Sequence, residues 1–287
     1  MRLASCLLGS QPVYGVVEDD GIAIISTVLG ERYPSLRSLL AGAADGQLYR
    51  KIDHAVASSP TVALSEVTFL PVIPEPQKII CVGLNYTPHR EETGRAPVDY
   101  PTLFTRFANS QVGHEAAIIA PSASRHFDYE GELAVIIGKQ GRHIDQRDAE
   151  DYIAGYTCFN DGSVRDYQRH SSQFTPGKNF HASGACGPWM VTADSVGDIR
   201  AATLVTRLNG KVLQSAVIAD MDFSIPQLIH YISGFTQLEP GDLIVTGTPG
   251  GVGYVRKPPI YMCHGDCVEV EISAIGVLRN PIVDEAS

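Results

Sequence analysis

The chain has 287 residues, of which 44% are hydrophobic and 19% are charged, a composition that fits one large globular domain or a large domain with a small one. Its formal net charge of −10 disfavours nucleic acid or an anionic membrane as a partner, because both attract basic surfaces. No stretch reaches the roughly 18 apolar residues of a membrane helix, and the apolar run in Met1–Leu8 is too short for a secretion signal, so we expect a cytoplasmic protein.

The first 72 residues are predicted to form a small α+β domain. Val13–Val17 and Ile22–Ile25 are strand-like runs on either side of a Glu-Asp-Asp-Gly turn, which favours a β-hairpin. The segment Tyr33–Leu40 is typical of a short helix. Three prolines between Leu70 and Pro76 predict a stiff, extended connector. We place the domain boundary there and expect no catalytic group before it.

Residues 73–287 are predicted to form the catalytic domain, with a β-dominated α/β fold. Its short apolar runs are rich in Val and Ile and are separated by Gly, Pro and Asp, which is typical of strands: Lys78–Val82, Leu133–Ile137, Ile153–Phe159, Leu243–Val245 and Val268–Ile272. Helical segments are fewer, and the clearest are Asp148–Tyr152 and Pro226–Ser233. The regular strand–helix alternation of a doubly wound sheet is absent.

An acidic pair marks the most informative strand, Asp128–Gly138. Side chains alternate between the faces of a strand, so Glu130 and Glu132 point the same way. Two partly buried carboxylates on one face repel each other unless a cation joins them, and oxygen ligands suit magnesium, manganese or calcium. Asp161 follows the strand-like run Tyr156–Asn160 and is the candidate third ligand. From these residues alone, two other interpretations stay open. Glu130 and Glu132 would then belong to a solvated acidic edge strand, and Asp161 to an ordinary Asn-Asp-Gly turn.

A segment that begins at Thr87 has the capping and termination signals of a short helix. Thr87 suits the N-cap, Pro88 the first helical position and Gly94 the exit. His89 and Glu92 are three residues apart and therefore share a face of such a turn. A carboxylate beside an imidazole orients the ring, which suits a general base. From the spacing alone, a surface ion pair in a charged loop is the stronger interpretation.

Other chemistries lack their signatures. The stretch Thr246–Gly253 is glycine-rich and follows a strand, as a phosphate loop does, but it has neither a Gly-x-Gly-x-x-Gly pattern nor a Walker lysine. A serine hydrolase of the Gly-x-Ser-x-Gly type would need an elbow that the sequence lacks. Cys263 and Cys267 flank a histidine and an aspartate, but a structural zinc site is disfavoured because no second ligand pair exists.

Five motifs follow one another along residues 78–283: Val82-Gly83-Leu84-Asn85-Tyr86 with His89, Asp128–Gly138, Asn160–Gln168, Pro176-Gly177-Lys178, and Thr246-Gly247-Thr248-Pro249 with Gly251-Val252-Gly253. Together they resemble the fumarylacetoacetate hydrolase family. The resemblance implies a mixed β-sandwich roll, a homodimer, and Glu130, Glu132 and Asp161 as ligands of a divalent metal. It also implies that the first 70 residues correspond to the variable N-terminal extension of that family.

The resemblance also assigns roles around the metal. It places the family's catalytic His–Glu pair on His89 and Glu92, within a segment that resembles a mobile lid. It makes Lys178 a catalytic cation of the pocket, with Gln168 and Thr248 as hydrogen-bond donors to a developing oxyanion. The resemblance therefore favours a catalytic role for His89 and Glu92 over a surface ion pair.

Three further residues lie near these motifs. Arg165 and Arg106 are candidates for binding a substrate carboxylate.

Gly131 departs from the family pattern, in which bulkier residues are common between the two glutamates. Its lack of a side chain affects the opposite face of the strand and leaves the ligands intact.

We therefore expect a metal-dependent hydrolase that cleaves a C–C bond in a 1,3-diketo acid of the acylpyruvate type, with Mg²⁺ or Mn²⁺ as cofactor and Ca²⁺ as a further candidate. Its partner would be a small 2-oxo acid, with the metal polarising the oxo group while His89 activates water. Two alternatives stay open. One is a decarboxylase or tautomerase of an oxo acid, such as oxaloacetate or a catechol-pathway intermediate, at the same metal site. The other is a non-enzymatic module that a metal stabilises.

Overall fold

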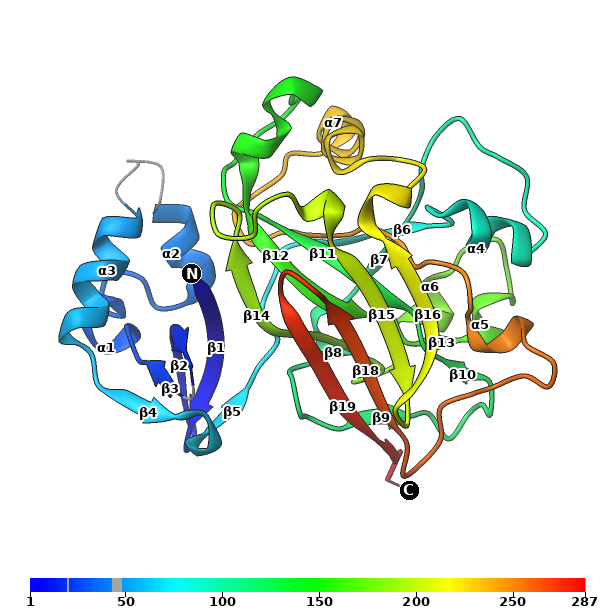
Figure 1. The fold of residues 1–287 in the computed structure, drawn as a ribbon, viewed down its shortest axis with the longest axis horizontal. Coiled ribbons are helices and arrows are strands. Elements are labelled where there is room, and N and C mark those ends of the chain that lie inside the picture. Colours follow the sequence, from blue (N-terminus) through cyan, green and yellow to red (C-terminus); the bar gives the residue numbers. More distant parts are fainter. Residues whose placement is uncertain (20, 43–47, 287) are drawn as a thin grey trace.

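The larger part of the molecule consists of two sheets that lie face to face, and a smaller lobe extends one of them (Figure 1). The computed structural model describes residues 1–19, 21–42 and 48–286. Among these residues, twelve strands form one mixed sheet, namely β1 (Arg2–Leu8), β2 (Gln11–Glu18), β3 (Gly21–Ala23), β4 (Thr61–Ala63), β5 (Val67–Phe69), β6 (Ile79–Gly83), β7 (Thr102–Arg106), β8 (Gln111–Val112), β11 (Gly131–Ile137), β12 (Ile153–Asn160), β14 (Gly184–Thr192) and β17 (Leu243–Val245). The remaining strands form a five-stranded sheet of β9 (Ile118–Ala120), β15 (Thr203–Leu208), β16 (Lys211–Val217), β18 (Cys267–Ile272) and β19 (Gly276–Asp284), and a two-stranded sheet of β10 (Phe127–Asp128) and β13 (Ser163–Val164). The predicted strand-dominated, mixed architecture is confirmed.

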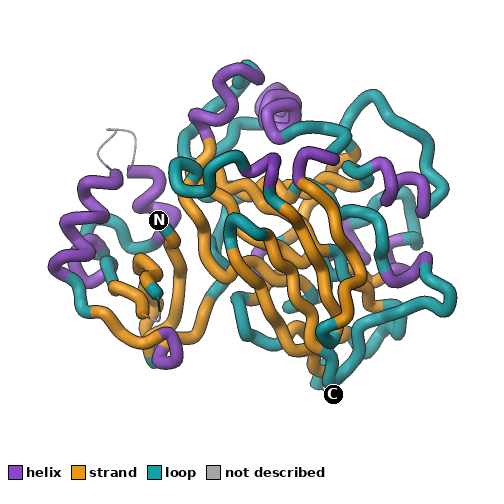
Figure 2. The backbone as a smooth tube through the Cα atoms, in the orientation of Figure 1, coloured by secondary structure: helices purple, strands orange, loops and turns teal. Residues whose placement is uncertain are grey.

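Short helices surround the sheets (Figure 2). The α-helices of the described residues are α1 (Ser26–Leu29), α2 (Leu36–Ala41), α3 (Leu48–Ser58), α4 (Thr87–Glu92), α5 (Arg165–Gln168), α6 (Thr175–Lys178) and α7 (Ile225–Phe235). The described residues also form the 3-10 helices η2 (Leu64–Glu66), η3 (Ala108–Ser110), η4 (Gln146–Tyr152), η5 (Ile199–Ala201), η6 (Ile218–Asp220) and η7 (Gly253–Val255). The helices predicted at Asp148–Tyr152 and Pro226–Ser233 correspond to η4 and α7. Among the described residues, no helix has the length and apolar character needed to cross a membrane.

The predicted hairpin is present in the N-terminal lobe, where β2 and β3 pair antiparallel with Glu18 opposite Gly21. Asp20 of the predicted turn lies outside the described residues. Beyond the lobe, each of the five predicted strand segments is a strand, namely β6, β11, β12, β17 and β18. Short runs rich in β-branched residues identify these strands because such side chains pack well on a pleated surface.

The helix predicted to begin at Tyr33 begins later, at Leu36. Ser35 is its N-cap, because the Ser35 hydroxyl accepts a hydrogen bond from the backbone N–H of Ser38 at 3.1 Å. Tyr33 precedes a proline, which disfavours helical backbone at that position.

Strand β11 lies inside the large sheet and is buried along its whole length. Leu133 and Val135 belong to a core cluster that also contains Leu204 of the five-stranded sheet. Ala134 and Ile136 belong to a second cluster. Successive side chains of a strand point to opposite faces, so β11 separates two cores and its polar N-terminal end lies between them.

The N-terminal lobe shares its sheet and one of these cores with the rest of the chain. Strand β1 pairs antiparallel with β14, where Leu3 lies opposite Met190. Leu39 of α2 is fully buried in the same cluster as Ile136 of β11. The lobe therefore covers part of the face of the large sheet, and a domain boundary between residues 72 and 73 stays a prediction.

We predict that a chain beginning at Ile73 is less stable than the full chain, because it loses the strand that pairs with β14 and the side chains that cover Ile136. Leu39→Ala should lower the free energy of unfolding by about 2–5 kcal/mol, the usual effect of such a cavity. Thermal and urea unfolding measure both effects, and a folded truncated chain should still bind Mn²⁺. Equal stability of the short and full chains would contradict a shared core.

Candidate active site

Three buried carboxylates meet where β11 begins beside the end of β12. Gly131 lies opposite Asn160 in this antiparallel pair, and the backbone N–H of Asp161 donates to the carbonyl oxygen of Glu130 at 2.8 Å. Glu130 and Asp161 are therefore neighbours, and strand alternation brings Glu132 to the same face. One carboxylate oxygen of each residue lies within 4.8 Å of the others. This group is the acidic triad.

The glycine between the two glutamates faces the five-stranded sheet. A Cβ atom at Gly131 would collide with the side chain of Thr206 on β15. The backbone N–H of Gly131 also donates to the Gln214 side-chain oxygen on β16 at 3.0 Å. The departure from the family pattern thus has a packing cause on the face opposite the triad.

Three cations surround the triad. Lys178 Nζ lies 2.5 Å from Glu130 Oε2 and 2.6 Å from Asp161 Oδ2. Arg165 Nη1 lies 2.7 Å from Glu130 Oε1, and Arg106 Nη1 lies 2.5 Å from Asp161 Oδ1. Burial raises the pKa of Glu130, but the charges of Arg165 and Lys178 outweigh it and hold that pKa below its ordinary value.

Glu132 is the triad member with no ion-pair partner among the described residues. Its Oε2 accepts a hydrogen bond from the backbone N–H of Gly247 at 2.6 Å, and Gly247 has a φ of +106°, which glycine adopts readily. Burial, and then the charges of Asp161 and Glu130, raise the pKa of Glu132 well above its ordinary value. A hard divalent cation would relieve this repulsion and prefers carboxylate oxygen. The triad is therefore suited to hold such an ion.

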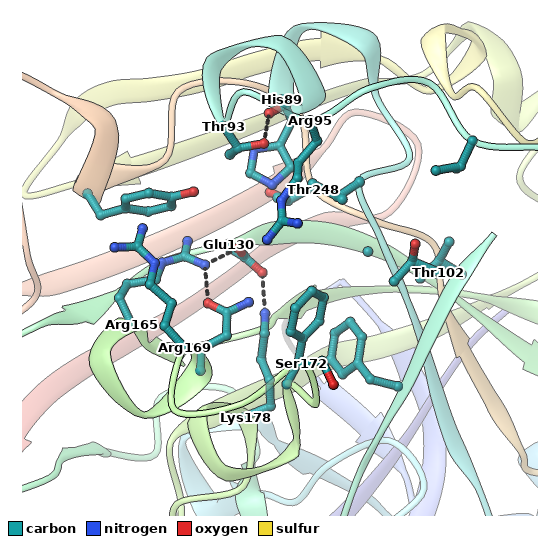
Figure 3. Close-up of a pocket in the computed structure, with 18 of the residues that line it drawn as sticks. His89, Thr93, Arg95, Thr102, Glu130, Arg165, Arg169, Ser172, Lys178 and Thr248 are labelled. Carbon is teal, nitrogen blue, oxygen red and sulfur yellow. Dashed lines mark hydrogen bonds and ion pairs between the residues drawn. The ribbon is translucent and has the colours of Figure 1, made fainter.

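A cavity of about 530 Å³ opens at the triad (Figure 3). Glu130 and Glu132 line it together with the predicted site residues His89, Arg165, Gln168, Lys178 and Thr248. These side chains come from α4, the residue before β11, β11 itself, α5, α6 and the loop after β17. The fold thus brings most of the predicted site residues to one space.

His89 and Glu92 form a hydrogen-bonded pair on α4. His89 Nδ1 lies 2.8 Å from Glu92 Oε1, and Glu92 Oε2 accepts a hydrogen bond from the backbone N–H of Gly251 at 2.8 Å. The two side chains share a face as predicted, which leaves the imidazole Nε2 without a partner in the described chain. The helix begins at Thr87, one residue earlier than predicted. Thr87 is not its N-cap, because the Thr87 hydroxyl donates to Asp222.

Two of the predicted oxyanion donors already have partners within the protein. The Thr248 hydroxyl donates to the carbonyl oxygen of Gly131 at 3.0 Å and accepts from Gln214 Nε2 at 2.7 Å. The Gln168 side-chain oxygen accepts from Arg165 Nη1 at 2.9 Å. The Gln168 amide nitrogen donates to no partner among the described residues, whereas the Thr248 proton is used.

Arg106 does not face the cavity as its predicted role requires. Its guanidinium is buried, and it donates to Asp161, to the carbonyl oxygen of Gly162 and to the Ser183 hydroxyl. Arg106 therefore supports a triad residue from behind. Arg165 does line the cavity, and its Nη2 is buried without a hydrogen-bond partner in the described protein.

Sequence reasoning missed two residues that hold the site together. Asp128 accepts hydrogen bonds from Arg165 Nε at 2.8 Å and from the backbone N–H of Gly253 at 2.8 Å. It stands at the same alternating position as the two glutamates, so a search at every second residue would have found it. Gln214 joins Thr248 to β11, but it lies on a distant strand and carries no local signal.

No zinc cluster forms at the cysteine-rich turn. Within the described ranges, the triad is the one group of three or more potential ligands that lie close together. Cys263 is exposed, and its thiol contacts Asp266 Oδ2 at 3.2 Å.

Comparison with known proteins decides the family. Residues 78–283 match the family of the fumarylacetoacetate (FAA) hydrolase C-terminal domain. The chain belongs to the fumarylacetoacetate hydrolase family. A mitochondrial oxaloacetate tautomerase of Rattus norvegicus is 42% identical over 229 residues, which cover 79% of this chain and 73% of that protein.

Solved structures of the fumarylacetoacetate hydrolase family share the whole fold. A fumarylacetoacetate hydrolase from Exiguobacterium antarcticum is 31% identical, with a TM-score of 0.87 over 99% of this chain and 100% of that one. A maleylpyruvate hydrolase from Sphingobium sp. SYK-6, solved with manganese(II) and pyruvate, is 28% identical, with a TM-score of 0.82 over 100% of both chains. The predicted family is thus confirmed, but its members bear the names of tautomerases and of hydrolases, so membership does not decide the reaction.

We predict that metal binding at the triad releases a proton. Between the ordinary range of a glutamate and the raised pKa of Glu132, this carboxyl carries a proton that a metal must displace. Affinity for Mn²⁺ should therefore rise with pH across that interval, by up to about tenfold per pH unit. Calorimetric titration in two buffers of different ionisation enthalpy counts the released protons.

Glu132→Gln should weaken Mn²⁺ binding and abolish the proton release, whereas the exposed Glu31→Gln should change neither. An affinity for Mn²⁺ that is independent of pH would contradict the protonated carboxyl.

Proposed function

We propose that the chain is a divalent-metal-dependent tautomerase, which interconverts the keto and enol forms of a small 2-oxo acid. The observation that carries the proposal is that His89 lines the same cavity as Glu130 and Glu132. Keto–enol interconversion needs a base that moves a proton at carbon and positive charge near the oxo oxygen. The 42% identity to a protein named oxaloacetate tautomerase supports this reaction.

We infer that Glu130, Glu132 and Asp161 hold Mg²⁺ or Mn²⁺. Their three buried carboxylates form an all-oxygen donor set, which also fits Ca²⁺. The manganese in the structure of the maleylpyruvate hydrolase supports an ion of this class. Such an ion supplies Lewis acidity, which polarises the 2-oxo group of a bound acid and makes the neighbouring C–H more acidic.

His89 is the group to which we assign proton transfer. Because Glu92 contacts Nδ1, the neutral ring carries its proton there and offers Nε2 as the base. In the keto-to-enol direction, Nε2 takes a proton from the carbon next to the oxo group, and the Glu92 charge stabilises the imidazolium that forms. The imidazolium then gives this proton to the enolate oxygen, which completes the enol and restores the neutral ring. The backbone N–H of Gly251 holds Glu92 in place during the transfer.

Arg165 is suited to bind the carboxylate next to the oxo group. Its Nη2 is buried and has no hydrogen-bond partner among the described residues, although Arg165 lines the cavity. A buried donor without a partner costs roughly 1–3 kcal/mol, and more when it is charged, so an anionic ligand at this point is favourable. Lys178, which stays between Glu130 and Asp161, adds positive charge near the oxo oxygen.

The site supplies fewer free hydrogen-bond donors than the hydrolysis expected from the sequence requires. It needs donors for a second oxyanion, at the distal carbonyl of the substrate. The Thr248 hydroxyl donates to Gly131, and Lys178 is engaged with two triad carboxylates. Of the three predicted donors, only the amide of Gln168 is uncommitted in the described structure. Tautomerisation forms no second oxyanion.

A small 2-oxo acid is the one partner that this proposal requires. A homodimer stays a prediction. So does a cytoplasmic location, and the relative from Rattus norvegicus is named as mitochondrial.

The proposed reaction can be followed by ultraviolet absorbance of the enol. The Mn²⁺-loaded protein should speed the decay of enol-oxaloacetate to the keto form by roughly 100-fold or more over buffer, the scale of general acid–base catalysis. Acetylpyruvate should yield no acetate, and oxaloacetate no carbon dioxide, above the uncatalysed rates. Rapid release of ¹⁸O-labelled acetate in H₂¹⁸O would instead establish hydrolysis, and rapid release of carbon dioxide would establish decarboxylation.

His89→Ala should lower kcat for tautomerisation by roughly 100-fold, because the base is lost, and should leave the affinity for Mn²⁺ nearly unchanged. Glu92→Gln should have a smaller effect, since the ring keeps a hydrogen-bond partner but loses the charge. His54→Ala, on an exposed residue of α3, is the control. A normal kcat in the His89→Ala protein would exclude this residue as the base.

A further inference from the structure

The backbone N–H group that orients Glu92 belongs to a glycine-rich loop. The N–H of Gly251 donates to Glu92 Oε2 at 2.8 Å, and Glu92 Oε1 lies 2.8 Å from His89 Nδ1. Gly250, Gly251 and Gly253 occupy three of four successive positions in this loop. Glycine has more backbone freedom than any other residue, and that freedom must be removed before the loop can hold a side chain in place. The orientation of Glu92 therefore depends on the contacts that fix Gly251.

Three hydrogen bonds fix the carbonyl group of Gly251. Its oxygen accepts from the Tyr129 hydroxyl at 3.1 Å, from Arg256 Nε at 3.1 Å and from Arg256 Nη2 at 3.0 Å. Tyr129 is fully buried, and its hydroxyl also accepts from Arg256 Nε at 3.2 Å. We call Arg256 and Tyr129 the Gly251 clamp. The clamp holds the carbonyl side of the residue whose N–H side holds Glu92.

The clamp fits closely around a residue that has no side chain. Gly251 has a φ of +104°, a conformation that residues with a side chain rarely adopt. A Cβ atom at this position would lie 2.3 Å from the carbonyl oxygen of Leu213 on β16 and 3.2 Å from Arg256 Nη2. The Leu213 carbonyl and the arginine therefore lie against the loop on the side where a side chain would project.

Arg256 contacts the protein framework and not the cavity. All four hydrogen bonds that it donates within the described chain go to uncharged oxygen atoms, and one of them reaches the carbonyl oxygen of Leu213 at 2.5 Å. It is half-buried and is not among the described residues that line the cavity. Because a guanidinium donates in a rigid, planar fork, this one side chain ties β16 to the loop. Hydrogen bonds from a charged donor are roughly twice as strong as neutral ones, so the arginine supplies the larger part of the clamp.

We propose that Arg256, with Tyr129, is a positioning residue for the base: by fixing Gly251, it holds Glu92 where Glu92 orients the ring of His89. This inference rests on the proposed role of His89 and adds a residue that touches neither the substrate nor the imidazole. Without the arginine, the N–H of Gly251 would lose its fixed direction, and Glu92 would hold Nδ1 less firmly. The neutral ring would then carry its proton on Nε2 for part of the time, and in that form Nε2 cannot accept a proton.

The kinetic test replaces the arginine by a side chain of similar length without donors. Arg256→Met should lower kcat for keto–enol interconversion by about 10-fold, because the base is misaligned, and should change KM less than about threefold, because the acid still binds. Tyr129→Phe, which removes one donor of the clamp, should lower kcat less. Arg256→Lys should restore part of the kcat that Arg256→Met loses, since a charged donor remains. Arg207→Met removes another half-buried arginine, which does not line the cavity, and should leave kcat unchanged.

A double-mutant cycle separates positioning from a general loss of structure. In a Glu92→Ala background Gly251 has no carboxylate to hold, so Arg256→Met should lower kcat there by less than about twofold. A loss as large as in the otherwise unchanged protein would show that the arginine does not act through Glu92 and would overturn the inference. Thermal unfolding checks that each variant is folded. If Arg256→Met does not fold, Arg256→Lys and Tyr129→Phe take its place in the cycle.

A second readout needs no substrate. In protein labelled with ¹⁵N-histidine, the chemical shifts of the ring nitrogens report which nitrogen of the neutral His89 ring carries the proton, and His89→Ala identifies the signals. The fraction with the proton on Nδ1 should fall in Arg256→Met and should stay at the wild-type value in Arg207→Met. An unchanged fraction in a folded Arg256→Met protein would exclude the positioning role.

This readout also distinguishes the inference from the proposed function. If the fraction depends on Arg256 while the enol decays at the uncatalysed rate, the positioning of His89 stands and the tautomerase assignment fails. If the enol decays rapidly and neither kcat nor the fraction depends on Arg256, the tautomerase stands and the role of the clamp is wrong.

Discussion

Negative charge buried at one point is the constraint on which the rest of this site depends. Three carboxylates cannot be held together in an apolar interior unless cations compensate them. The protein brings Lys178, Arg165 and Arg106 to the triad, but these reach only Glu130 and Asp161. The compensation is incomplete at Glu132, and this shortfall is what makes the site receptive to a further cation.

The two-sheet architecture makes this concentration of charge possible. The pairing of β11 with β12 places two triad members side by side, and apolar clusters pack on both faces of β11, which keeps the triad buried except where the cavity opens. Gly131 lets the five-stranded sheet approach closely, so that Gln214 can reach the loop containing Thr248. The chemistry on one face of β11 is thus supported by contacts on the other.

Much of this could be predicted from local pattern. Alternation along β11 aligned Glu130 with Glu132, and a three-residue spacing joined His89 to Glu92, because both relations depend only on backbone geometry. The order of the motifs added Asp161 and the family. The buried position of Arg106, the commitment of the Thr248 hydroxyl and the sheet pairing of the N-terminal lobe depend on partners far away in the chain, which no local signal reports.

Gln214 has a consequence for how this protein can change over evolutionary time. Strand β16 lies at the edge of the five-stranded sheet, where Lys211 and Val212 are exposed and sequence drift is tolerated. A single-residue insertion in the β15–β16 hairpin would slip the register and exchange the face of every side chain that follows. Gln214 would then turn to solvent, and both Gly131 and Thr248 would lose a hydrogen bond. Length variation at this hairpin is therefore coupled to the geometry of the candidate site, although no described residue of the hairpin lines the cavity.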